Sequence, residues 1–148
     1  PLVLFEVIDS QNKYDAAEDA FNNAVRLDPD NSQAIHNLGI VYLNKNDTAR
    51  AEQMFRKVYQ LNSENPGVIL MLAQVLSRNE KTVSEAISLY QKAITLTPGN
   101  VQAYMDLGNV YLRMQDKANA LRAFEKALGL NPGSKELRAA VESLKRTK

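Results

Sequence analysis

The sequence predicts an all-α protein in which pairs of antiparallel helices are repeated along the chain. The first observation is the apolar spacing within residues 101–134, where Tyr104, Leu107 and Tyr111 fall on one helical face. The second is a stop after the second helix of this segment, because Pro132 has no N–H for the next helical hydrogen bond. The third is the return of the same pattern along the whole chain.

Four columns of residues repeat with one period. Neighbouring members of a column are 34 or 35 residues apart, which chance amphipathicity does not produce. The period overrides the local pattern at the start of the chain, where the apolar stretch PLVLFEVI would otherwise fit a strand. The columns are Leu4, Leu38, Leu72 and Leu107; Ala17, Ala51, Ala86 and Ala120; Phe21, Phe55, Tyr90 and Phe124; and Leu27, Leu61, Leu96 and Leu130.

The repeated residues are similar to those of the tetratricopeptide-repeat (TPR) family. The similarity rests on Tyr-x-x-Leu-Gly-x-x-Tyr at 104–111, followed by Ala120, Phe124, Ala127 and Pro132, and it covers nearly the whole chain. The resemblance implies a right-handed superhelical solenoid of antiparallel helix pairs. It also implies a concave groove lined by the leading helices, meaning the first helix of each pair. Such a groove is the usual binding surface of these solenoids.

The chain is expected to form one domain over residues 1–148 with about nine helices. Helix starts are expected after Asp47, Asn65, Asp116 and Ser134, whose side chains can accept orphan backbone N–H groups. In order, the expected parts are a truncated first repeat at 1–31 with helices at about 2–11 and 14–27, a repeat at 32–65, a repeat with a one-residue insertion at 66–100, a repeat at 101–134 and a C-terminal capping helix at 135–148.

Several positions depart from the repeat pattern. Phe5 stands where later repeats have glycine, so the first helix is expected to be splayed or packed against something else. The insertion lies within residues 77–85, and we interpret it as a tolerated surface turn, with a contact loop as the alternative. In the first complete repeat, the second helix is expected to bury four apolar residues: Ala51, Phe55, Val58 and Leu61.

Composition excludes several classes of function. Eighteen Lys and Arg residues balance 17 Asp and Glu residues, so the net charge of +1 gives no reason to expect nucleic acid as a partner. The absence of cysteine excludes disulfides and thiolate metal sites, and is compatible with cytoplasm and periplasm, of which we favour the cytoplasm. No apolar run reaches the length of a membrane span, so direct membrane insertion is not expected. The start at Pro1, without a signal peptide, indicates an excised or processed piece.

No catalytic, metal or cofactor site is predicted, and we expect the protein not to be an enzyme. His36 is the one histidine, and we interpret it as an exposed polar residue, with a ligand-contacting or pH-sensing role as the alternative. Phosphate-binding glycine loops are missing from the sequence. Acidic pairs such as Glu18 and Asp19 are better explained by solvation and capping than by acid–base catalysis.

The remaining candidate is a partner-binding groove, which the resemblance assigns by register. Its apolar residues can adapt to a partner surface, and its amides can hydrogen-bond a peptide backbone of either polarity. The predicted groove residues are Gln33, His36, Asn37, Ile40, Asn44, Leu70, Met71, Gln74, Arg78, Gln102, Met105, Asp106, Asn109 and Arg113.

We therefore expect a non-catalytic scaffold that binds a protein or peptide partner. The C-terminal peptide of heat-shock chaperones is not expected, because Gly67 and Met71 occupy positions where co-chaperones of this family carry carboxylate-binding cations. One alternative is self-assembly through an apolar N-terminal edge formed by Leu2, Leu4, Phe5 and Ile8. The other is the docking or regulatory arm of a larger enzyme.

Overall fold

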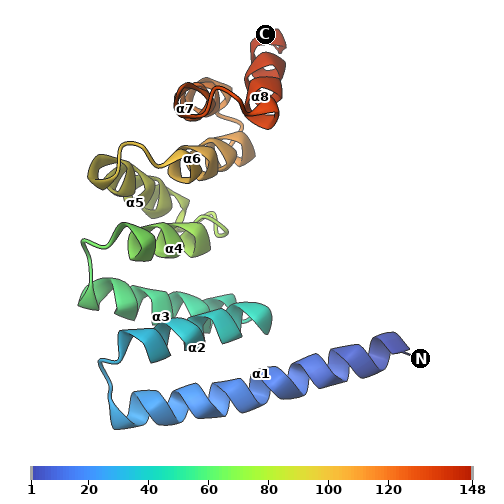
Figure 1. The fold of residues 1–148 in the computed structure, drawn as a ribbon, viewed down its shortest axis with the longest axis vertical. Helices are drawn as coiled ribbons and strands as arrows, with labels where there is room; N and C mark the ends of the chain where they lie inside the picture. The colour runs from blue at the N-terminus through green and yellow to red at the C-terminus, as the bar shows by residue number, and fades with distance from the viewer. Residues whose placement is uncertain (1, 148) are drawn as a thin grey trace. The chain divides into compact units, whose positions relative to one another are not determined.

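The computed structural model describes residues 2–147, and their side chains from Ser10 onward. These residues form eight helices and no strands, so the predicted all-α fold is confirmed. Contacts divide the chain into an N-terminal unit, Pro1–Ser63, and a C-terminal unit, Glu64–Lys148. The helices are α1 (Leu2–Leu27), α2 (Ser32–Asn44), α3 (Thr48–Leu61), α4 (Pro66–Leu76), α5 (Val83–Leu96), α6 (Val101–Arg113), α7 (Lys117–Leu130) and α8 (Lys135–Arg146) (Figure 1).

Each unit is built by packing helices that follow one another in the chain. In the N-terminal unit, α2 packs against both α1 and α3. In the C-terminal unit, each helix from α4 to α8 packs against the next. Leu137 and Val141 of α8 are buried in a cluster with Ala120, Phe124 and Ala127 of α7, so α8 covers the end of the last helix pair.

Side-chain caps begin most of these helices. The Asp47 carboxylate accepts the Arg50 N–H at 3.0 Å, and the Asp116 carboxylate accepts the Asn119 N–H at 3.1 Å. These backbone hydrogen bonds hold the pKa of both aspartates below the usual range, because they stabilise the ionised form. The predicted caps are confirmed at Asp47, Asn65, Asp116 and Ser134.

Helix α1 differs from the sequence-based expectation. Separate helices at about 2–11 and 14–27 are wrong, since α1 is one helix of 26 residues and the total is eight rather than about nine. In the short turns between α2 and α3 and between α6 and α7, one residue has a positive φ: Asn46 at 60° and Gln115 at 61°. Each of these residues comes immediately before the capping aspartate, Asp47 or Asp116. The position 34 residues before Asp47 is Lys13, whose ammonium has donors but no acceptor. Without a cap there, nothing ends one helix and starts the next.

Ion pairs connect α1 to the following helices. The Lys45 ammonium contacts the carboxylates of Asp15, at 2.7 Å, and Glu18. The Arg50 guanidinium also reaches Glu18, at 3.1 Å. Hydrogen bonds from Lys45 hold the pKa of both carboxyl groups below their ordinary values. These contacts fix the C-terminal half of α1 to α2 and α3.

Two helix pairs meet through a glycine and a phenylalanine. A Cβ atom built on Gly39 would lie 2.8 Å from the Phe55 ring, and one built on Gly108 would lie 2.9 Å from the Phe124 ring. Both phenylalanines are buried, at 2% and 4% exposure. The leading helix therefore approaches the ring so closely that a side chain at the glycine would have to displace it.

The expected burial of Leu61 is wrong. Its side chain is 41% exposed, and the other leucines of its column, Leu27, Leu96 and Leu130, are 77%, 41% and 45% exposed. Each is the last residue of its helix, where little of the neighbouring chain remains to cover it. Its predicted companions Ala51, Phe55 and Val58 are buried.

The apolar edge proposed for self-assembly lies outside the described side chains. It consists of Leu2, Leu4, Phe5 and Ile8, for which the structure gives the helical backbone alone. Phe5, which stands where later repeats have glycine, lies in the same stretch, so the expectation based on its side chain also lies outside the described side chains.

Candidate functional site

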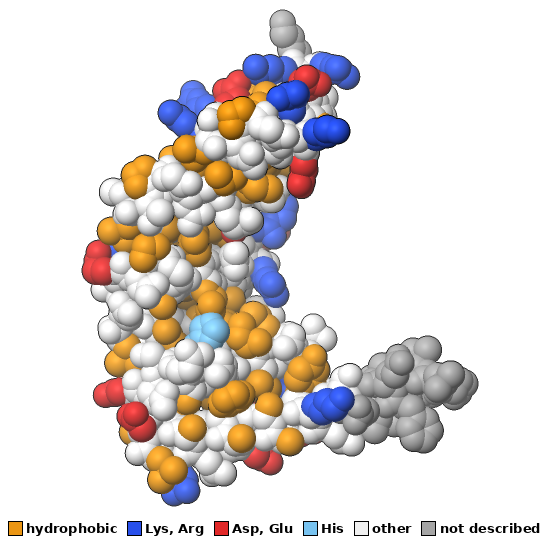
Figure 2. All heavy atoms as spheres, viewed as in Figure 1, with side chains coloured by type: hydrophobic (Ala, Val, Ile, Leu, Met, Phe, Trp, Pro, Cys, Tyr) orange, Lys and Arg blue, Asp and Glu red, His pale blue; other side chains and the backbone are white. Residues whose placement is uncertain are grey.

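The fourteen predicted groove residues fall into two groups, one in each unit. Five lie on α2 in the N-terminal unit, and nine lie on α4, the turn after it and α6 in the C-terminal unit. Every one of them is exposed or half-buried, although Met105 also packs against the core cluster of α7 and α8 and His36 contacts buried Phe55. On the face shown in Figure 2, acidic and basic side chains occur in small separate groups, in keeping with the balanced charge.

In the α2 group, local contacts dominate. The Gln33 amide donates to Asn37 Oδ1 at 3.1 Å. His36 is half-buried, and its ring packs edge-on against Phe55, with centroids 5.9 Å apart and an interplanar angle of 70°. The interpretation of His36 as an exposed polar residue is therefore wrong, because its ring extends the core of its own helix pair. Ile40 and Asn44 are exposed.

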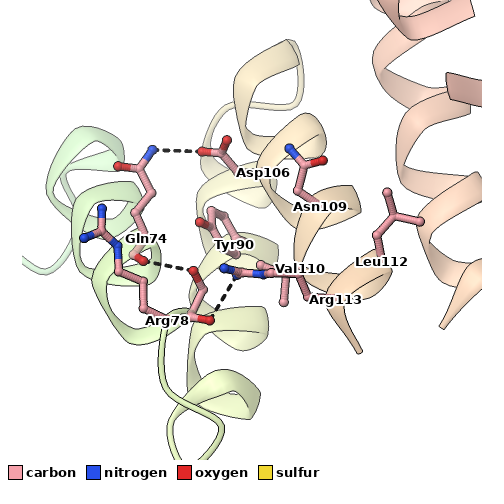
Figure 3. A pocket seen from close by; sticks show the side chains of 9 residues that line it. Gln74, Arg78, Tyr90, Asp106, Asn109, Val110, Leu112 and Arg113 are labelled. Carbon is pink, nitrogen blue, oxygen red and sulfur yellow. Dashed lines mark hydrogen bonds between the residues drawn. The ribbon is translucent and has the colours of Figure 1, made fainter. Parts of the chain in front are cut away.

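The α4 and α6 group surrounds a hollow of about 520 Å³, which we call the α4–α6 pocket (Figure 3). Five predicted groove residues line it, whereas Leu70, Met71, Gln102 and Met105 do not. Sequence reasoning missed four lining residues. The lining is Gln74, Ser77, Arg78, Tyr90, Asp106, Asn109, Val110, Leu112 and Arg113.

Two hydrogen-bonded links join α4 to α6 across this pocket. At one end, the Gln74 amide donates to Asp106 Oδ2 at 2.9 Å, and Gln102 donates to the other carboxylate oxygen at 2.7 Å. At the other end, Arg113 reaches across to donate to the Ser77 carbonyl at 3.0 Å (Figure 3). The links bridge the two helices, with the Asp106 carboxylate in one link and the Arg113 guanidinium in the other.

Tyr90 supplies the floor of the pocket. Its side chain comes from α5 and is only 1% exposed. Burial raises its pKa to about 12, with the Asp106 carboxylate adding to the shift and a hydrogen bond with Ser77 opposing it. The hydroxyl therefore stays protonated at neutral pH and acts as a hydrogen-bonding group. A signal for it was present in the sequence, since Tyr90 is the one tyrosine in a column of phenylalanines.

A second, smaller hollow of about 220 Å³ adjoins the α4–α6 pocket, and we call it the side pocket. The two share Ser77, Arg78, Val110 and Arg113. The side pocket adds Glu80 and Val83 from the region of the inserted residue, together with Met114, which is 46% exposed. Both arginines thus face both hollows.

Within the described part of the chain, no group of three or more His, Cys, Asp or Glu side chains is arranged to hold a metal ion. Among residues 2–147, no helix has both the length and the apolar character needed to cross a bilayer.

Two family models match this chain in different regions. The model described as Regulator of microtubule dynamics protein 1-3 matches residues 70–147. The model described as Tetratricopeptide repeat matches residues 9–66. Together these matches cover most of the repeated segments.

Two of the curated relatives are similar over most of this chain but are much longer. Protein O-mannosyl-transferase TMTC3 from Homo sapiens is 29% identical over 144 residues, covering 88% of this chain and 16% of the relative. BBSome complex member BBS4 from Bos taurus is 24% identical over 135 residues, covering 91% of this chain and 26% of the relative. The chain therefore spans about a quarter or less of the length of these relatives.

A solved structure has the same fold. The crystal structure of MamA matches with a TM-score of 0.80 and 24% identity, covering 92% of this chain and 79% of the MamA chain. At that identity the likeness concerns the fold.

Proposed function

Because the chain belongs to the tetratricopeptide-repeat family, we propose that it is a non-catalytic scaffold that binds a segment of a partner protein through the leading helices α4 and α6 of its C-terminal unit. Repeat solenoids bind partners through the leading helices of their repeats. The name of one relative, BBSome complex member, is that of a subunit of an assembly, which supports this class of function. The proposal assigns binding to surface side chains rather than to a catalytic centre.

The observation that carries the proposal is the α4–α6 pocket. Its walls come from two successive leading helices, which are joined by side-chain hydrogen bonds. Exposed amides at Gln74 and Asn109 can hydrogen-bond the backbone of an extended partner. Half-buried Leu70 and Met105 on the same two helices offer apolar contact. The surface therefore offers an extended partner both hydrogen-bonding groups in the pocket and apolar groups beside it.

The chemistry of the pocket supports binding rather than catalysis. Tyr90, its buried titratable group, has a pKa of about 12 and keeps its proton near neutral pH. The Asp106 carboxylate is engaged by two amides. General acid–base catalysis near neutral pH favours groups that exchange protons there, and Tyr90 does not.

The test replaces two apolar residues on the proposed surface with acids. Leu70→Glu combined with Met105→Glu should abolish partner capture, in a crosslinking pull-down analysed by mass spectrometry, without changing helicity in circular dichroism. The matched control is Leu96→Glu combined with Leu130→Glu, which adds the same charge at exposed leucines on helix ends. Partners that persist with the first pair and disappear with the control would place binding on another surface.

A second candidate function is the docking arm of a larger enzyme. The human relative is named as a transferase, and this chain spans 16% of its length. The sequence of the transcript around this chain is the test. An adjoining catalytic domain would support the docking role, and a transcript that ends at this domain would remove it.

Self-association is a third candidate. Helix α1 has 26 residues and α2 has 13, so half of α1 has no counterpart of equal length in α2 (Figure 1). Light scattering on a chromatography column tests this candidate. A mass that rises with concentration would support self-association, whereas a constant mass near 16.5 kDa would exclude it.

A further inference from the structure

We propose that Arg78 and Arg113 bind an acidic side chain, aspartate or glutamate, in the middle of an extended partner segment. This inference rests on the proposed function, because it assigns a partner chemistry to the α4–α6 pocket. It predicts that the bound segment carries an acidic residue beside an apolar one.

The two arginines have no acidic partner in the described structure. Ion pairs of arginine found within residues 10–147 belong to Arg50 and Arg56, whereas Arg78 and Arg113 have none. Arg113 donates to the Ser77 carbonyl, but a guanidinium has five N–H donors, so most of its donors remain available. Both side chains are exposed and line the same hollow. They therefore present positive charge that no described carboxylate neutralises by direct pairing.

The one acidic residue of the α4–α6 pocket does not replace an acidic ligand. Both carboxylate oxygens of Asp106 accept hydrogen bonds from amides, one from Gln74 and one from Gln102. Figure 3 shows the Gln74–Asp106 link at the opposite side of the pocket from the Arg113–Ser77 link. An acid bound at Arg113 would thus lie on the other side of the pocket from the aspartate.

The adjoining side pocket favours an internal acidic residue over a chain end. Arg78 and Arg113 lie between two hollows of about 520 and 220 Å³, so a segment can continue past them on both sides. The side pocket carries apolar Val83 and Met114, which fit an apolar neighbour of the acid. Glu80, also in the side pocket, would repel a second acid there.

Local departures from the repeat pattern put the first arginine in place. Helix α4 has 11 residues, whereas α2 and α6 each have 13. The chain after Leu76 is closed by a hydrogen bond of 2.6 Å from the Thr82 hydroxyl to the Leu76 carbonyl. Ser77 and Arg78 therefore leave the helix early and line the pocket.

The chemistry of this surface matches a carboxylate. A guanidinium can donate two parallel N–H bonds to a carboxylate, which are shorter and stronger than neutral hydrogen bonds. The protonated hydroxyl of Tyr90 beneath the arginines is a further hydrogen-bonding group that bears no charge to repel the acid. The site differs from the predicted carboxylate-clamp positions Gly67 and Met71, neither of which lines the pocket.

The test is selection from a random library of dodecapeptides blocked at both ends. The baits are the unaltered protein, the double variant Arg78→Gln and Arg113→Gln, and a charge-matched control, Arg122→Gln with Lys126→Gln. The control residues are exposed on α7 and line a different hollow. We expect peptides retained by the unaltered protein and the control to be enriched in an acidic residue next to an apolar one. The arginine variant should lose this enrichment.

Titration of the most enriched peptide gives the size of the effect. Loss of each arginine should weaken binding about tenfold to a hundredfold, as expected for hydrogen bonds to a charged group. Arg113→Lys, which keeps the charge but loses the planar fork, should retain part of the affinity. A peptide whose glutamate is replaced by glutamine should bind the unaltered protein as weakly as the arginine variant binds the original.

The outcomes separate this inference from the proposed function. Retained peptides without an acidic preference, or a preference that survives in the arginine variant, would overturn the acidic-segment proposal alone. Retention by none of these baits, or equal retention when the Leu70→Glu and Met105→Glu variant is used as a fourth bait, would overturn binding on this surface altogether.

Discussion

Two of the three complete helix pairs meet through glycine and phenylalanine, whereas the middle pair has alanine and tyrosine at those positions. The two pairs with glycine and phenylalanine, which we call the glycine pairs, contain Gly39 with Phe55 and Gly108 with Phe124. The middle pair, α4 and α5, has Ala73 and Tyr90, both fully buried. The middle pair is also the one with the inserted residue and the shortened leading helix.

This difference shows how a structural position of the repeat can also serve a surface. In the glycine pairs, the ring lies against the leading helix and the aromatic residue serves packing alone. In the middle pair, the ring is equally buried, but it carries a hydroxyl, and Tyr90 lines the α4–α6 pocket. One aromatic position therefore supplies core packing in all three pairs and a polar pocket floor in one.

The largest loss of stability is expected when the phenylalanine ring is removed from a glycine pair. Phe124→Ala should lower the free energy of unfolding by about 3–5 kcal/mol, because it leaves a cavity in the cluster shared by α7 and α8. Urea unfolding measures this change. A loss below about 1 kcal/mol would mean that the ring does not support the pair, and the contrast with the middle pair would lose its basis.

The core of the repeats could be predicted from the sequence because it depends on residues with one fixed spacing. Phe55, Ala51 and Leu38 are buried as their columns predict. The continuous α1 could not be read from those columns, because it depends on a single missing cap at Lys13. Leu61 was placed wrongly because the periodicity gives its face but not its position at the last turn of the helix.

The candidate site was predictable in part. The family resemblance, applied by register, placed Gln74, Arg78, Asp106, Asn109 and Arg113 on one surface, and the structure brings these five around one pocket. Register could not show the pocket floor or the links between α4 and α6. Those features depend on the path of the chain after Leu76 and on the hydroxyl of one tyrosine, which are tertiary details.

A smaller effect is expected when a methyl group is added to a glycine pair. Gly108→Ala should lower the free energy of unfolding by about 1 kcal/mol, because crowding against the Phe124 ring exceeds the gain in helix propensity. The matched control is Gly129→Ala in α7, where a Cβ atom meets nothing within 4 Å. The free energy of unfolding of that control should rise by about 0.5–1 kcal/mol, because alanine loses less backbone entropy on folding than glycine does. If Gly108→Ala stabilises as much as the control, close approach does not explain the glycine.

The smallest effect at neutral pH is expected for Tyr90→Phe, which makes the middle pair resemble its neighbours. Loss of the hydroxyl and of its interaction with Ser77 should cost about 0.5 kcal/mol, the low end of the range for a neutral hydrogen bond. The effect changes sign in alkaline solution. The folded protein holds the Tyr90 proton up to a pKa of about 12, whereas the unfolded chain releases it near 10.0, so stability falls as pH rises between these values.

The variant lacks this proton, so its free energy of unfolding should decline less above pH 10 than that of the unaltered protein. Urea unfolding at pH 8 and pH 11 measures the difference, and Tyr111→Phe, at a half-buried tyrosine of α6, is the matched control. Only the Tyr90 substitution should flatten the alkaline decline, because burial beneath the pocket is what disfavours the ionised ring. Equal declines for Tyr90→Phe and the unaltered protein would mean that the Tyr90 hydroxyl is open to water, and the middle pair would then differ from its neighbours in sequence but not in environment.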